Sequence, residues 1–122
     1  MPKGQKPMQG AGPLPRDVTG KVPAWLRRAL TKGTPLHKES GAIHTRSTEI
    51  DGKEILYPTV RIINGKAVDL TKEAGNTKDF DVALEYAKRK KDYIVVEGGP
   101  RAATLLSRRL SKKVGRVQGS ND

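Results

Sequence analysis

The segment Ile43–Leu70, with the sequence IHTRSTEIDGKEILYPTVRIINGKAVDL, decides the fold that we predict for this chain. Its dipeptides Asp51-Gly52 and Asn64-Gly65 suit two-residue type I′ turns, in which both central residues take a positive φ. The runs beside these turns are rich in Ile, Val, Thr and Tyr, which are typical of strands. We therefore predict a three-stranded antiparallel meander over Ile43–Ile50, Lys53–Ile63 and Lys66–Leu70.

Pro58 lies inside the middle strand of this prediction. Because proline has no backbone N–H, it cannot donate a hydrogen bond to a neighbouring strand. We expect a bulge or a locally free edge at this position. The first strand alternates without a strongly apolar face, which indicates an edge strand.

A short helix is predicted N-terminal to the meander, between Pro23 at its first position and Gly33 at its end. A helix of this length is marginal alone, so it needs a surface to pack on. Three surfaces are possible: its own sheet, a partner protein with Trp25 as the anchor, and a membrane. For the partner alternative, the predicted docking residues are Trp25, Leu26, Arg27, Arg28 and Leu30.

Two further helices are predicted after the meander. Thr77 is a suitable N-cap for a helix that reaches Lys90 or Lys91 and buries Phe80. The short apolar run 93–96 is predicted as a fourth strand. A last helix begins at Pro100 and ends at Gly115, a residue that commonly stops helices.

The resulting order of elements is α-β-β-β-α-β-α, which predicts the α+β class. We expect a small, mostly antiparallel sheet, made of the meander plus one strand, with two or three helices covering one side. Residues 1–41 are predicted to form an extended, basic, Gly/Pro-rich arm that includes the short Trp-containing helix. Residues 42–116 then form the compact domain, and residues 117–122 a disordered tail.

The net charge of +11 is concentrated at the two flanks of the chain. Residues 1–41 carry eight Lys or Arg and two acidic residues, residues 42–76 carry five of each, and residues 77–122 carry eleven and six. Such flanks attract a phosphate backbone, an anionic membrane surface or an acidic protein, although a soluble basic surface has the same composition. No run approaches the ~20 apolar residues of a membrane-spanning helix, so no membrane span is predicted.

The last predicted helix carries the most concentrated charge. Between Pro100 and Arg116 the sequence has six cations and no acidic residue. Like charges at i, i+4 spacing destabilise a helix, and a partner of opposite sign would relieve that repulsion. The helix dipole offsets part of it without any partner. We predict that contact with DNA or an acidic protein surface is made by Arg101, Arg108, Arg109, Lys112, Lys113 and Arg116.

No catalytic or metal-binding constellation rises above background in the sequence. The two histidines, His37 and His44, have no ligand spacing, and the chain contains no cysteine. Gly98-Gly99-Pro100 lies between a strand and a helix but lacks the lysine of a phosphate-binding P-loop. We therefore predict no enzymatic activity, no cofactor, no metal and no small-molecule substrate.

The string HTRSTEIDGKEILYPTVR, followed by an NGK turn and by ALEYAKRKKDYIVVEGGPRAATLLSRRL, resembles a module in virion proteins of tailed bacteriophages. The resemblance covers about Ile43 to Leu110. In larger relatives the module sits within tail-associated or DNA-ejection proteins, and it carries no known catalytic residues. The matching positions are Thr45-Arg46-Ser47, Ile50-Asp51-Gly52-Lys53-Glu54, Pro58-Thr59-Val60, Ala83, Tyr86, Pro100, Ala102-Ala103 and Leu110.

This resemblance implies a non-enzymatic structural protein of a virion that assembles in the host cytoplasm. The implied partners of the N-terminal arm are other virion proteins in a multi-copy assembly. The last helix would contact the backbone of packaged DNA or an acidic surface. The sequence departs from the family pattern in its Lys/Arg-rich helices and its Gly/Pro-rich arm. A free, non-specific nucleic-acid-binding protein acting in the infected cell is the alternative.

Overall fold

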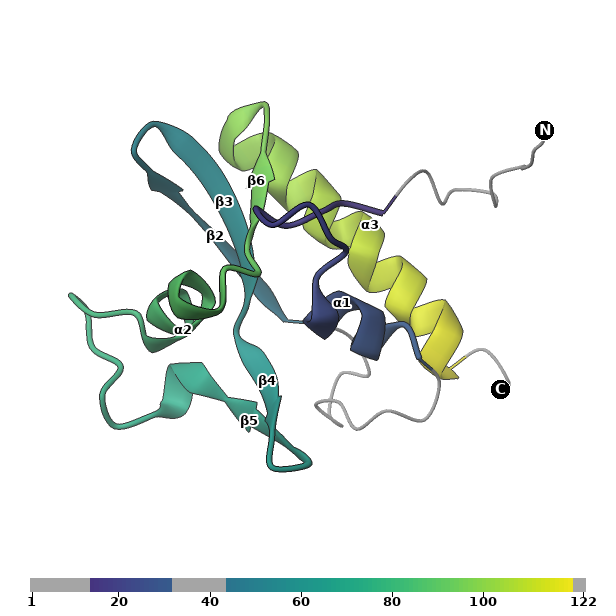
Figure 1. The fold of residues 1–122 in the computed structure, drawn as a ribbon, viewed down its shortest axis with the longest axis horizontal. Coiled ribbons are helices and arrows are strands. Elements are labelled where there is room, and N and C mark those ends of the chain that lie inside the picture. The colour runs from purple at the N-terminus through teal and green to yellow at the C-terminus, as the bar shows by residue number, and fades with distance from the viewer. Residues whose placement is uncertain (1–13, 32–43, 120–122) are drawn as a thin grey trace.

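The computed structural model describes residues 14–31 and 44–119, and Figure 1 shows their arrangement. The fold is α+β with antiparallel strands, as the sequence predicted. The predicted arm and tail lie in part outside the described residues. The elements are α1 (Ala24–Ala29), β2 (Thr45–Ile50), β3 (Lys53–Pro58), β4 (Val60–Ile63), β5 (Lys66–Asp69), a 3-10 turn η1 (Leu70–Lys72), α2 (Val82–Lys90), β6 (Ile94–Val96) and α3 (Gly99–Gly119).

Both predicted turns are present. Asp51 and Gly52 have φ values of 52° and 78° and join β2 to β3, with Ile50 opposite Lys53. The same conformation recurs at the second turn, where Asn64 has φ 53° and joins β4 to β5. Since both central positions of such a turn need a positive φ, the Asp-Gly and Asn-Gly pairs account for the registers of the two hairpins.

The predicted middle strand is divided at Thr59, and the meander is two sheets rather than one. β3 lies between β2 and β6 in a three-stranded sheet, whereas β4 pairs only with β5. The prediction of a continuous strand over Lys53–Ile63 was therefore wrong. The break falls directly after Pro58, which has no N–H to donate to a neighbouring strand. The Thr59 amide donates to the His44 carbonyl at 2.8 Å, and the Thr59 carbonyl accepts from the Leu70 amide at 2.8 Å.

Helices cover both faces of the β2-β3-β6 sheet, which corrects the prediction that they cover one side. On one face Leu56 packs with Leu26 of α1 and Leu110 of α3. On the other face Ile55 and Tyr57 pack with small residues of α2. β3 is buried from Glu54 to Pro58, the pattern of a strand with no solvent-facing side. Figure 1 shows α2 and α3 on opposite sides of this sheet.

The first and second helices are shorter than predicted. α1 ends at Ala29, and Gly33 lies outside the described residues. The helix predicted from Thr77 begins only at Val82, because Asp81 is the N-cap and accepts a hydrogen bond from the Leu84 amide. Thr77 instead closes a separate turn, in which its hydroxyl accepts from the Phe80 amide at 3.0 Å. Phe80 is 49% exposed, so it is not part of the buried stripe as predicted.

The last helix begins at Gly99, one residue before the predicted start, and runs to Gly119. It therefore does not end at Gly115, and the predicted tail boundary at residue 117 falls within the helix. An interior glycine costs a helix about 0.5–1 kcal/mol relative to alanine. The burial of the neighbouring Val114, together with Leu110 one turn earlier, accounts for the continuation.

Candidate basic interface

The six predicted cations all lie on α3, whose 21 residues include no Asp or Glu. The buried stripe of Ala103, Leu110 and Val114 fixes the rotation of the helix against the sheet. That rotation leaves five of the six cations exposed and Lys113 partly buried. Among the described residues, no acidic side chain forms an ion pair with any of the six. The helix dipole favours Arg116, which lies in the last turn, but not Arg101, which lies in the first.

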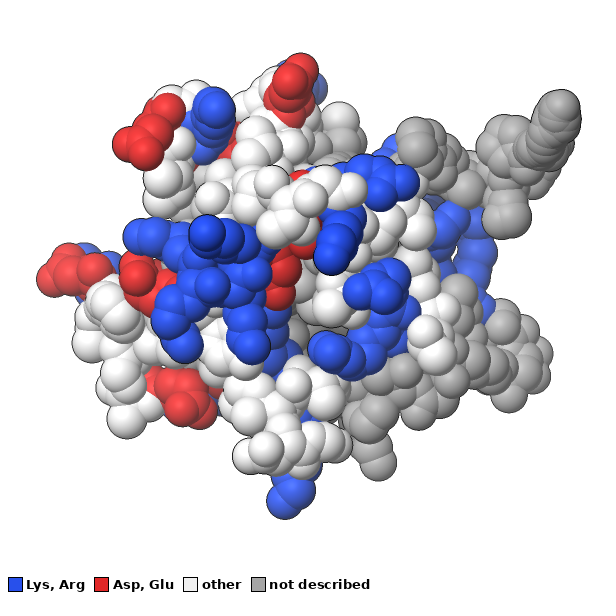
Figure 2. Space-filling view, in the orientation of Figure 1, with Lys and Arg blue, Asp and Glu red and all other residues white. Residues whose placement is uncertain are grey.

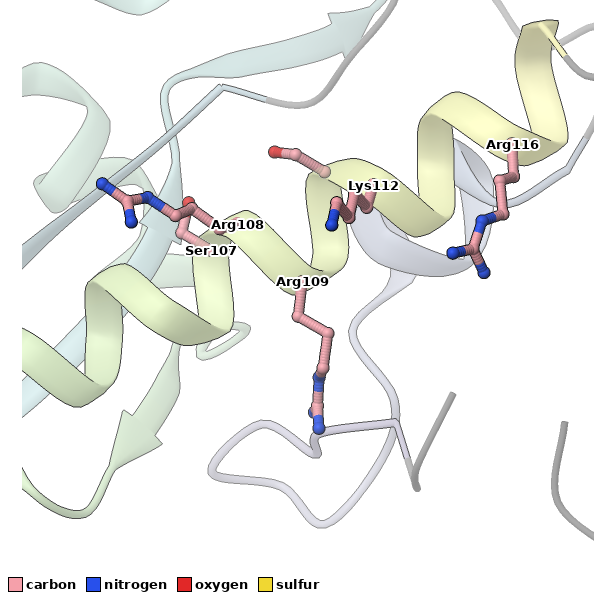
Figure 3. A pocket seen from close by; sticks show the side chains of 6 residues that line it. Ser107, Arg108, Arg109, Lys112 and Arg116 are labelled. Carbon is pink, nitrogen blue, oxygen red and sulfur yellow. The ribbon is translucent and has the colours of Figure 1, made fainter. Parts of the chain in front are cut away.

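Four of these cations surround one open depression along α3. Its volume is about 710 Å³, and two serine side chains line it together with the cations. Figure 3 shows Arg108 and Arg109 leaving the helix in different directions, with Lys112 and Arg116 further along it. Arg101 and Lys113 do not line the depression, so the structure brings together only part of the predicted set. The described lining is Ser107, Arg108, Arg109, Ser111, Lys112 and Arg116.

The serines of this depression were missed by sequence reasoning, which considered charge alone. Ser107 shares a side-chain hydrogen bond with Thr45, and this contact ties the middle of α3 to the edge strand β2. Ser107 and Ser111 are one helical turn apart, as are Arg108 and Lys112. Serine hydroxyls together with Arg and Lys are the side-chain donors commonly found on phosphate oxygens. Their i, i+4 spacing beside the cations was the signal that could have identified them.

The predicted docking residues of α1 are divided between core and surface. Trp25 is 6% exposed, Leu26 is fully buried and Leu30 is partly buried in the same cluster. Of the three surfaces considered for this helix, the structure therefore selects its own domain. Trp25 and Leu26 do not form an exposed docking anchor, which corrects that prediction. Arg27 and Arg28 remain exposed, as predicted.

A second basic surface lies between α1 and α2 and was not predicted. Figure 2 shows Lys and Arg side chains gathered over α2 and over α1 on one face, with a narrow recess between them. A cleft of about 150 Å³ occupies this position. Its described lining combines cations with two aromatic rings and one carboxylate: Ala24, Trp25, Arg28, Arg61, Ile62, Tyr86, Lys90 and Asp92.

The floor of this cleft is a buried ion pair. Arg61 is 7% exposed, and its Nη1 and Nη2 donate to Asp92 Oδ2 at 2.6 Å and Oδ1 at 2.9 Å. The guanidinium also lies over the Tyr86 ring, 4.7 Å from its centroid. Trp25 Nε1 donates to the backbone carbonyl of Asp92 at 2.8 Å, which connects the pair to α1. No local pattern in the sequence indicates this pair, because Arg61 and Asp92 are 31 residues apart.

A separate polar network attaches α2 to the sheet. The Tyr57 hydroxyl donates to Asp81 Oδ2 at 2.6 Å, and Arg46 Nη1 donates to the same oxygen at 3.1 Å. Burial and the adjacent Asp81 carboxylate raise the pKa of Tyr57 well above its usual range. A tyrosine held neutral in this way is a donor that positions the cap of α2, and it does not serve as a base near neutral pH.

The described part of the chain contains no helix long and apolar enough to cross a membrane. Within the same residues, no three His, Cys, Asp or Glu side chains gather as a candidate metal site. The two basic surfaces are the candidate sites in which cations gather around a depression or cleft. Comparison of the chain with protein-family models, with curated proteins and with solved structures found no match.

Proposed function

We propose that this chain is a non-enzymatic structural protein that binds the nucleic-acid backbone through the basic face of α3. The observation that carries this proposal is the open depression of α3, where four cations lie without an acidic partner among the described residues. Arg108, Lys112 and Arg116 follow one another at intervals of about 6 Å along the helix. Each phosphate contact would release condensed counterions, which favours association at low salt.

Two features favour phosphate over an acidic protein surface as the partner. Ser107 and Ser111 add hydroxyl groups beside the cations of the depression, and such groups commonly contact phosphate oxygens. Among the described residues, the lining has no aromatic anchor of the kind that protein interfaces favour. It also offers no aromatic platform for stacking bases. The binding mode that fits is therefore to the backbone, without sequence preference.

The setting of this function is proposed from the resemblance to tailed-phage virion proteins over about Ile43 to Leu110. In that setting the N-terminal arm, residues 1–41, docks on other virion proteins. Because Trp25 and Leu26 belong to the core, docking through α1 would use its exposed face, where Arg27 and Arg28 lie. The role of residues 1–13 and 32–41 remains a prediction from the sequence.

A salt titration of duplex DNA binding tests the nucleic-acid function. We expect binding at low salt, with a linear fall of log K against log salt concentration. Replacing Arg108, Arg109, Lys112 and Arg116 with Gln keeps helix propensity nearly constant and removes four charges. The slope should fall by about 0.9 for each phosphate that the variant no longer binds.

A matched control also removes four positive charges, at the exposed residues Lys53, Lys66, Lys72 and Lys78. It should change the slope much less than the α3 variant, because it leaves the depression intact. An equal decrease of the slope in both variants would mean that net charge alone determines binding, and it would contradict the proposed site. No detectable binding at low salt by the unaltered protein would overturn the nucleic-acid function itself.

Particle composition tests the virion setting. We expect mass spectrometry of purified particles to find the protein at a reproducible copy number. Deletion of residues 1–33 should reduce its incorporation, and because this deletion also removes Trp25 and Leu26 from the core, its folding must be checked by circular dichroism. A second variant that removes only residues 1–13 avoids the core. Presence in infected cells but absence from particles would instead support the free nucleic-acid-binding protein.

A further inference from the structure

We propose that the cleft between α1 and α2 is a second anion site, which takes a single phosphate group of the nucleic-acid backbone. This inference rests on the proposed function, because it assigns a further contact to the same class of ligand. The site belongs to different elements from the α3 depression, since its cations come from α1, β4 and α2. Arg28, Arg61 and Lys90 line it, and Asp92 is its only described acidic residue.

The charges around the cleft are not balanced. Asp92 directs both carboxylate oxygens at Arg61, and among the described residues it forms no ion pair with Arg28 or Lys90. No other described acidic side chain forms an ion pair with these two residues. An anion in the cleft would therefore be attracted by two cations, one on each wall, that no described carboxylate neutralises.

Three cationic side chains gather around the aromatic wall of the cleft. The Tyr86 centroid lies 4.7 Å from Arg61 Cζ, 5.1 Å from Arg89 Cζ and 5.7 Å from Lys90 Nζ. Each cation is attracted to the ring, but the three repel one another. A phosphate oxygen nearby would reduce that repulsion. The arrangement of these cations in the anion-free protein therefore favours the binding of an anion.

Arg61 supplies the observation that points to a ligand independently of surface charge. Its Nε is buried and finds no hydrogen-bond acceptor in the described structure, although its two terminal nitrogens are bound by Asp92. Buried donors almost always have a partner, so an exception calls for an explanation such as a bound ion. An anion oxygen in the cleft lined by Arg61 would supply this acceptor once a small shift of the side chain exposes Nε to the cleft.

The size and rigidity of the cleft define what it accepts. Its volume of about 150 Å³ is below the 300–1,000 Å³ typical of pockets for drug-sized ligands. That space accommodates a phosphate group with a little water but not a whole nucleotide. The Trp25–Asp92 hydrogen bond and the left-handed conformation of Lys91, with φ 57°, hold the floor in place. Little reorganisation is therefore required before an anion binds.

Nucleic-acid phosphate is favoured over free phosphate because the cleft opens onto a larger basic face. Lys and Arg side chains on α1 and α2 gather around the recess in Figure 2. On α1 and α2, Arg27, Lys88 and Arg89 are exposed but do not line the cleft, and Lys88 also pairs with Glu85 at 3.3 Å. They would contact neighbouring phosphates of a continuous backbone, whereas a free ion would use only the cleft.

Trp25, the single tryptophan of the chain, is a direct reporter of this site. We would follow its indole N–H resonance by NMR in the full-length protein during titration with inorganic phosphate, with sodium chloride at matched ionic strength as the reference. A second titration uses a short duplex DNA. We expect saturable shifts of the Trp25 resonance with phosphate and with DNA, and none with chloride.

Two variants separate this inference from the proposed function. Arg28→Gln with Lys90→Gln should weaken the phosphate response at least tenfold, while the four-charge α3 variant should retain it even if its affinity for DNA falls. If Trp25 does not respond to phosphate, or if the Arg28/Lys90 variant responds normally, the cleft is not an anion site, and DNA binding through α3 stands. A response to phosphate but not to DNA would overturn the assignment to backbone phosphate.

Discussion

The hydroxyl of Tyr57 and the carboxylate of Asp81 form a 2.6 Å hydrogen bond that joins the central strand to the cap of α2. The same carboxylate accepts hydrogen bonds from Arg46 on β2 and from the Leu84 amide of α2. One side chain therefore connects two strands and a helix. The position of the α2 cations relative to the sheet depends on this connection.

We predict that Tyr57→Phe lowers the free energy of unfolding by about 1–2 kcal/mol. The substitution removes a hydrogen bond to a charged acceptor while keeping the buried ring, and part of the loss is recovered because water can reach Asp81. Urea denaturation measures the change. Tyr93→Phe is the matched control and should stay within about 0.5 kcal/mol, since no described residue contacts that hydroxyl through a hydrogen bond. Equal effects of the two substitutions would contradict the role of the Tyr57–Asp81 contact.

The same network predicts a dependence of stability on pH. Burial raises the pKa of Asp81, but hydrogen bonds from Tyr57, Leu84 and Arg46 lower it by more, so the net shift is downward from 3.8. A carboxyl group whose pKa is lower in the folded state than in the unfolded state stabilises the fold at any pH above its unfolded-state pKa. It loses that contribution as the pH falls through the folded-state pKa. We expect stability to decrease as the pH falls below about 4. Thermal unfolding of Asp81→Asn, whose Asn still caps α2, should show a shallower decrease, and an identical profile would contradict this assignment.

The buried pair beneath the cleft predicts a larger effect. Asp92→Asn leaves the Arg61 guanidinium buried without its counter-charge, which should cost about 3 kcal/mol. Combining it with Arg61→Met removes the uncompensated charge, so the double variant should be more stable than Asp92→Asn alone. A double-mutant cycle by chemical denaturation measures the coupling. A cost below about 1 kcal/mol for Asp92→Asn would show that solvent reaches the pair more freely than its burial indicates.

A fourth prediction concerns the turn that leads into α3. Gly98 has φ 104°, and a Cβ there would lie 2.9 Å from the Cβ of Ala102. We expect Gly98→Ala to destabilise the protein by about 2 kcal/mol or more, through backbone strain and this close contact. Gly75→Ala is the control, because its Cβ would make an ordinary contact of 3.7 Å with Val82. Similar unfolding midpoints for the two variants would contradict the strain at Gly98.

The features that could be predicted from the sequence are those set by neighbouring residues. The Asp51-Gly52 and Asn64-Gly65 turns follow from backbone preferences that two adjacent residues determine. The basic face of α3 follows from composition within a single helix. By contrast, the sequence predicted the start of α2 at Thr77, whereas Asp81, a residue type that also caps helices, is the N-cap. Contacts of Asp81 with Tyr57 and Arg46 decide between them, and these contacts come from distant parts of the chain.

The cleft between α1 and α2 could not be predicted for the same reason. Arg61 lies on β4 and Asp92 follows α2, so their pairing forms only after the chain leaves the main sheet at Pro58 and Thr59. The sequence did indicate a disturbance at Pro58. It contained no local signal that β4 would pair with β5 alone, away from the three-stranded sheet.

The packing of Leu26 against Leu56 and Leu110 has a consequence for the synthesis of the protein. Leu26 is made early and Leu110 late, yet both belong to one core cluster. While the chain is being made, α1 can therefore cover only part of its apolar face, against Leu56 and Ile94, until α3 has emerged from the ribosome. Completion of this core waits for α3, which delivers the basic surface and the final hydrophobic contact in the same step.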